Sequence, residues 1–159
     1  MTPIGDFTDT DRILGVMGLT ERDLPETQLV SMQIQIELAI ELYSWFPDYD
    51  TRYDAWYNAG SPVAADQNNI HLLQSFCTFY AAYLVCSGLE LFIQISITDS
   101  KMQMSRYANL DLDGIRKRML ANSAKAKKVL ATAEGIVLPS TTPTLFSSVS
   151  PSFDPVTGS

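Results

Sequence analysis

The segment at residues 64–97 limits what this chain can fold into more than any other part of the sequence. Its letters, AADQNNIHLLQSFCTFYAAYLVCSGLELFIQISI, favour one long helix, with Ser87-Gly88 as the only point of interruption. At about 1.5 Å per residue such a helix would exceed about 40 Å, which is longer than a small globule needs. We therefore expect an elongated helical protein. The final LFIQISI alternates apolar and polar residues, so a short terminal strand is the alternative there.

The segment SMQIQIELAIELYSWF at residues 31–46 alternates in the same way, as a half-buried strand would. Just upstream, however, DLPE offers Asp23 as an N-cap, Pro25 within the first turn and Glu26 in a capping box. Phe46-Pro47 is a stop signal, because the residue before proline avoids the α region. We therefore predict a helix that begins after Asp23 and ends at Phe46.

This predicted helix has two apolar faces. On a wheel that advances about 100° per residue, its glutamates fall in one narrow polar stripe, and its apolar residues form two rows on nearly opposite sides. One row can pack within its own subunit, whereas the other needs either another helix of the same domain or another copy of the chain. The first row is Ile34, Leu38, Leu42 and Trp45, and the second is Leu29, Met32, Ile36, Ile40 and Tyr43.

The rest of the chain predicts a single all-α domain, a small elongated bundle with a long central helix and extended arms. Residues 1–9 are expected to be an irregular N-terminal arm, and Gly15 and Gly18 keep a helix at residues 11–19 short. The helical domain spans residues 10–135. Residues 136–159, with four prolines and many Ser and Thr, form an extended tail that keeps a few apolar anchors, namely Leu145, Phe146, Val149 and Phe153.

Aromatic residues mark a short helix that follows Pro47. Tyr49, Tyr53, Trp56 and Tyr57 recur at helical spacing and so share one face. Packing inside the protein is the first interpretation of this face, and a site for stacking sugars or binding peptides is the second. The aspartates in the same stretch lack the central glycine and distal glutamate of a calcium loop, so we expect no metal there.

Charge is distributed unevenly along the chain. Residues 1–100 hold 14 acidic and 3 basic side chains, a net −11, whereas residues 101–159 hold 4 acidic and 8 basic ones, a net +4. The basic excess lies in a helix predicted from about Asp111 or Asp113 to Glu134, with Ile115, Met119, Ala126, Val129 and Ala133 facing inward. Its cations can contact phosphates, form a solvated face, or match the acidic part of a neighbouring copy. They are Arg116, Lys117, Arg118, Lys125, Lys127 and Lys128.

The sequence contains no recognisable catalytic motif. It has no glycine-rich phosphate loop, no G-x-S-x-G elbow and no Cys-x-x-Cys, and its only histidine, His71, has no metal-ligand spacing around it. Glu90 stands alone in an apolar segment. We therefore expect a protein that is not an enzyme and that has no catalytic residues, metal or cofactor. The overall charge of −7 argues against a general nucleic-acid binder.

Cysteine usage and the N-terminus indicate where the chain is found. Cys77 and Cys86 are nine residues apart in one predicted helix and so lie on opposite faces, which favours two reduced thiols in a cytosolic setting. The N-terminus has neither a basic region nor an apolar core typical of a cleaved signal. Residues 75–89 are uncharged but shorter than the roughly 20 apolar residues of a membrane span, so a buried helix is the preferred interpretation.

Taken together, the order of these elements resembles the head-to-tail adaptor, or connector, proteins of tailed bacteriophages. The resemblance covers residues 10–134. It is carried by DRILGVMGLTERDLPETQL, by the long helix at residues 64–97, and by TDSKMQMSRYANLDLDGIRKRMLANSAKAKKVL, with its Arg106-Tyr107 pair. The motifs match the family in order and length more than in chemistry. The 24-residue tail and the aromatic segment at residues 43–57 depart from the family pattern.

The resemblance implies a homo-oligomer, a dodecameric ring in the virion at the head–tail interface. Such a ring binds the portal protein on one side and the tail or nozzle protein on the other, and double-stranded DNA passes through it; its subunits are made in the host cytoplasm. The tail anchors would then dock on the portal, and the row from Leu29 to Tyr43 would be the subunit interface. The cations Arg116, Lys117, Arg118, Lys125 and Lys128 would lie at a charged interface or at the channel.

Two alternatives come from other classes of protein. A small phage membrane or lysis protein would use residues 70–97 as a span. A sugar- or peptide-binding module would instead use the aromatic face from Tyr49 to Tyr57.

Overall fold

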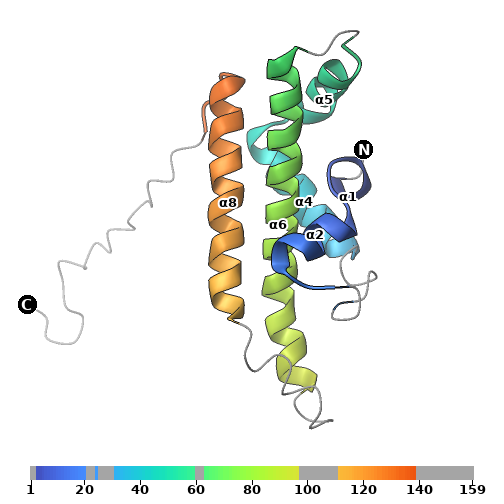
Figure 1. Cartoon of the computed structure of the whole chain (residues 1–159), viewed down its shortest axis with the longest axis vertical. Coiled ribbons are helices and arrows are strands. Elements are labelled where there is room, and N and C mark those ends of the chain that lie inside the picture. Colours follow the sequence, from blue (N-terminus) through green and yellow to red (C-terminus); the bar gives the residue numbers. More distant parts are fainter. Residues whose placement is uncertain (1–2, 21–23, 25–30, 60–62, 97–110, 139–159) are drawn as a thin grey trace, which may run out of the picture.

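In the computed structural model, helices pack around one long central helix, as Figure 1 shows. The structure describes residues 3–20, 24, 31–59, 63–96 and 111–138, with side chains up to Gly88 in the long helix. The helices are α1 (Pro3–Asp6), α2 (Thr10–Met17), α4 (Met32–Trp45), α5 (Tyr49–Tyr57), α6 (Ala64–Ser96) and α8 (Leu112–Ala133). No strand is found in these ranges, and an isolated bridge joins Ile4 to Thr8. The predicted all-α fold with a long central helix is confirmed.

Helix α6 runs without interruption through Ser87-Gly88 to Ser96. The predicted alternative of a short strand at its end is therefore wrong, because the backbone remains helical from Leu91 to Ser96. The hydroxyls of Thr78 and Ser87 donate to carbonyl oxygens one turn earlier, which satisfies these polar groups without leaving the helix. Continuous helical hydrogen bonding outweighs the two-residue alternation in this segment.

Helix α8 lies antiparallel to α6 along much of its length (Figure 1). Its buried residues include Ser123, Ala126 and Ala131, whose small side chains let the two helices approach closely. The predicted inward face is only partly right. Met119 and Ala126 are buried and Ile115 is half-buried, but Val129 and Ala133 are exposed and Leu130 is buried in their place.

The predicted boundaries of α8 are confirmed. Asp111 caps the N-terminus by accepting a hydrogen bond from the amide of Gly114 at 2.8 Å, and Gly135 ends the helix with a left-handed φ of 67°. After that turn Ile136 and Leu138 pack back against the core. The described part of the residue 136–159 segment therefore belongs to the helical body.

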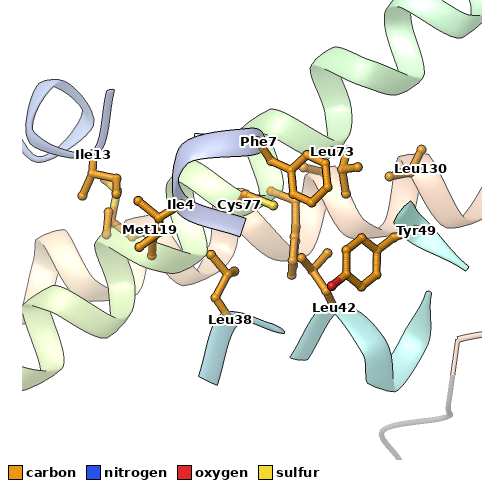
Figure 2. Packing of buried hydrophobic residues seen from close by; sticks show 14 of the residues in the cluster. Ile4, Phe7, Ile13, Leu38, Leu42, Tyr49, Leu73, Cys77, Met119 and Leu130 are labelled. Carbon is orange, nitrogen blue, oxygen red and sulfur yellow. The ribbon is translucent and has the colours of Figure 1, made fainter. Parts of the chain in front are cut away.

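The N-terminal residues have the irregular backbone that the sequence predicted, but they fold onto the core and do not extend as an arm. Residues 3–8 form a tight turn in which Gly5 has a φ of 112°, and this turn buries Ile4 and Phe7 in the core. The hydroxyls of Thr8 and Thr78 lie 2.8 Å apart and fasten the turn to α6. Figure 2 shows Phe7 lying beside Cys77 and Leu73 of α6.

Helix α4 begins later than predicted. Its N-cap is Ser31, which has non-helical backbone angles and whose hydroxyl accepts a hydrogen bond from the amide of Ile34. A continuous helix from Asp23 is therefore wrong, although Asp23 itself lies outside the described residues. The predicted end is confirmed, since α4 stops at Trp45 just before Phe46-Pro47.

Candidate assembly surfaces

Helix α4 has the two apolar faces that the sequence predicted, and the fold buries only one of them. Leu38, Leu42 and Trp45 are almost fully buried, and Ile34 is half-buried against the core. The other row stays exposed: Met32 is 79%, Ile36 44%, Ile40 64% and Tyr43 67% exposed. We call these four residues the α4 stripe. Leu29, predicted in the same row, lies outside the described residues.

A polar margin runs along one side of the α4 stripe. Glu37 accepts a hydrogen bond from the side-chain amide of Gln33 at 2.5 Å, and no cation lies within ion-pair distance of it in the described ranges. Farther around the helix, Glu41 pairs with Lys127 of α8 at 2.8 Å. This margin therefore offers one carboxylate, Glu37, to a binding partner.

The outward surface of α8 is basic, as predicted. Arg118, Lys125 and Lys128 are exposed, and within the part of the chain that the structure describes none has a carboxylate within 4.0 Å. Between them lie Leu120, Ala121 and Ala124, all exposed. Lys117 precedes this apolar patch by one turn. We call these seven residues the α8 outer face.

Two of the predicted cations are already paired on α8. Arg116 and Lys117 contact the carboxylate of Asp113 at 2.9 and 2.6 Å. The hydrogen bond from Lys117, followed by the charges of Lys117 and Arg116, lowers the pKa of Asp113; the same hydrogen bond raises the pKa of Lys117. This pair stabilises the first turn of α8, because Asp113 also carries the negative charge favoured at a helix N-terminus.

The aromatic face of α5 is mostly core. Tyr49, Tyr53 and Trp56 are buried, which confirms packing as the interpretation for these three residues, while Tyr57 is 69% exposed. Phe7 packs edge-on against Tyr53, with ring centroids 4.7 Å apart. Figure 2 shows Tyr49 on the same side of the core as Leu42. A stacking site made of all four residues is therefore not formed.

Three further side chains, not singled out by the sequence, tie α5, α6 and α8 together. Glu134 at the end of α8 accepts from the side-chain amide of Asn69 at 2.7 Å and lies 3.7 Å from Arg52. Because these three residues are far apart in the sequence, no periodic pattern predicts that they are in contact. The contact fixes the end of α8 against the first turns of α6.

A shallow groove of about 450 Å³ lies between α2 and α6. Arg12 and Val16 line one wall and His71, Gln74 and Phe79 the other. The guanidinium of Arg12 lies 3.3 Å from Asp9, so this cation already has a partner. Within the described ranges no group of three His, Cys, Asp or Glu side chains could hold a metal.

By length and composition alone, the stretch Ala64–Gly88 could cross a membrane, and within the described ranges it is the one helical stretch that could. In this fold 44% of the apolar window within this stretch is buried, and α2, α4, α5 and α8 all pack against α6. The core helix of a globular protein passes the same test.

The four predicted tail anchors all lie outside the described residues.

Comparison of the chain with protein-family models, with curated proteins and with solved structures finds no match. Among the described residues, the α4 stripe and the α8 outer face are the surfaces that bear on function.

Proposed function

We propose that this chain is a structural virion protein of a tailed bacteriophage, whose copies form a dodecameric ring between the portal and the tail. The observation that carries the proposal is the α4 stripe. Four large apolar side chains at helical spacing stay exposed on a helix whose opposite row is buried in the core. Such a contiguous patch on a small protein marks an interaction surface.

The patch is large enough for a weak contact between copies, which needs a further interaction to be stable. Fully burying one large apolar side chain stabilises by roughly 1.5–3 kcal/mol, and these four are already partly buried. Association costs about 4–15 kcal/mol in lost translational and rotational freedom. The stripe alone therefore supports only a weak pair, and we expect the ring to close when the portal gathers the copies.

The charge distribution supports the same function. The elongated body is basic on α8 and acidic elsewhere, so one copy can attract the next. In this proposal the tail beyond Leu138, with Leu145, Phe146, Val149 and Phe153, fastens the ring to the portal. The channel passes double-stranded DNA without reading its sequence.

Co-sedimentation with DNA-filled heads that carry the portal but lack tails tests the proposal. We expect the full chain to bind at one dodecamer per head, and a chain that ends at Leu138, which keeps the core contacts of Ile136 and Leu138, to lose binding. Ile40→Asp should also prevent ring formation, whereas Gln67→Asp, at an exposed site on α6, should not. Absence of binding by the full chain would refute the connector function.

A further inference from the structure

We propose that the α4 stripe of one copy docks on the α8 outer face of a second copy, so that two different surfaces of the chain meet. This inference rests on the self-association in the proposed function and names the contact that produces it. The α4 stripe thus binds another copy of the chain. Around an assembly, each copy contacts one neighbour through its α4 stripe and the other neighbour through its α8 outer face.

The side-chain sizes on the two surfaces suit helix–helix packing. Met32, Ile36 and Ile40 follow one another at i, i+4 and i+8 and form a ridge of large side chains. On the α8 outer face, the exposed residues Ala121 and Ala124 have small side chains, and Leu120 beside them is 43% exposed. A ridge of large residues packs against small residues of a facing helix, because the small side chains let the two backbones approach.

The charges select this pairing over the pairing of like surfaces. Helix α4 carries two carboxylates and no cation, a net −2, whereas α8 carries six cations and one carboxylate, a net +5. Two α4 surfaces, or two α8 surfaces, would repel each other. An α4 surface on an α8 surface brings Glu37 to a helix whose Arg118, Lys125 and Lys128 have no ion-pair partner in the described ranges.

Within one copy the same two helices already make a contact of this kind. Glu41 and Lys127 join α4 to α8 at 2.8 Å, on the sides that face each other inside the subunit. Ile40 of the stripe and Lys128 of the outer face, the sequence neighbours of Glu41 and Lys127, stay exposed although this internal contact is made. A contact between two different surfaces is heterologous, and repeated copies then close into a ring or extend into a filament.

Thiol cross-linking maps the contact in the full chain. Cys77 and Cys86 are buried, so a short bis-maleimide will report thiols introduced at the surface. We expect a cross-linked dimer when Ile40→Cys and Ala124→Cys chains are mixed, both in concentrated solution and on portal-bearing heads. Neither variant alone should cross-link, and Gln67→Cys mixed with either should not. A dimer of Ile40→Cys with itself would overturn the inference in favour of like surfaces.

Charge reversal tests the pairing independently. Lys125→Glu and Glu37→Lys should each weaken self-association by about tenfold or more, and a chain that carries both changes should recover it. Asp11→Lys, an exposed change on α2, is the control and should have no effect. If the double variant is weaker than either single variant, the two residues do not face one another and the inference fails.

The experiments separate this inference from the proposed function. Dodecamers that form on heads without the mixed cross-link would leave the connector function standing and overturn the α4–α8 contact. A mixed cross-link without binding to heads would support the contact and refute the connector. A chain that does not self-associate under either condition would overturn the contact as well.

Discussion

Lys127 places its ammonium nitrogen 2.8 Å from a carboxylate oxygen of Glu41, and thereby joins α8 to α4. The same nitrogen lies 5.3 Å from the centre of the Trp45 ring, so one cation serves both an ion pair and a cation–π contact. Both charged side chains are largely buried, at 21% and 30% exposed. The α4 stripe takes no part in this contact and stays exposed.

Replacing Lys127 should destabilise the fold. We expect Lys127→Met to lower the free energy of unfolding by about 1 kcal/mol, because it removes a partly buried ion pair and a cation–π contact. Lys128→Met, one residue along and exposed, should change stability by less than about 0.5 kcal/mol. Urea unfolding of both variants measures the difference, and equal effects would show that the Lys127 contact contributes no stability.

The two rows of α4 should respond differently to truncation. Leu38→Ala, at a fully buried position, should cost about 2–5 kcal/mol, because it leaves a cavity in the core. Ile40→Ala should change the stability of the dilute monomer by less than about 0.5 kcal/mol, since Ile40 is 64% exposed. Chemical unfolding at low protein concentration checks this, and a large effect of Ile40→Ala would place that row inside the core.

Glu134 should stabilise the fold through Asn69 more than through Arg52. Glu134→Ala leaves the amide of Asn69, a residue only 7% exposed, without its acceptor, and should cost about 1–3 kcal/mol. Glu134→Gln keeps an acceptor oxygen and loses only the charge contact with the exposed Arg52, so we expect a loss below about 1 kcal/mol. Thermal unfolding that ranked the two variants in the opposite order would contradict this.

Alkaline pH should destabilise the protein through Tyr80. Burial, together with the nearby Glu41, Tyr83 and Glu37, raises the pKa of Tyr80 from 10.0 to about 12. Between these values the unfolded chain has released the proton while the folded chain holds it, so stability is full below pH 10 and falls as the pH rises toward 12.

Tyr80→Phe should make this fall less steep while keeping the ring stacked on Phe76. Urea unfolding at a series of pH values above 9 provides the measurement, and Tyr57→Phe, which removes an exposed hydroxyl, is the control. An unchanged slope in Tyr80→Phe would refute the role of this residue.

Local signals predicted the long elements well. The lengths of α6 and α8 follow from helical patterning together with the cap at Asp111 and the glycine at 135, all of which act within a few residues. The two rows of α4 follow from the period of the helix alone. Which row the core takes does not, because both are equally apolar.

Other features depended on contacts between distant residues. Ser31 and Asp23 are both good N-caps, and local preference does not choose between them. Phe7 has no apolar neighbours at a regular spacing that would indicate burial. It nevertheless packs against Tyr49 and Tyr53, which lie more than 40 positions away along the chain. The helical wheel did not predict which side of α8 faces α6, because Val129 and Leu130 are both apolar. Only close packing on α6 selects Leu130 for burial.

By itself the sequence determined an all-α chain with one helix longer than a small globule needs, a helix α4 that is apolar on two sides, and a basic helix α8. Each of these features follows from the order of residues along a helix. Only the tertiary structure decided which surfaces stay exposed. Burial is a property of neighbours in space, and the positions of α2, α5 and α8 around α6 left the α4 stripe and the α8 outer face without a covering element among the described residues.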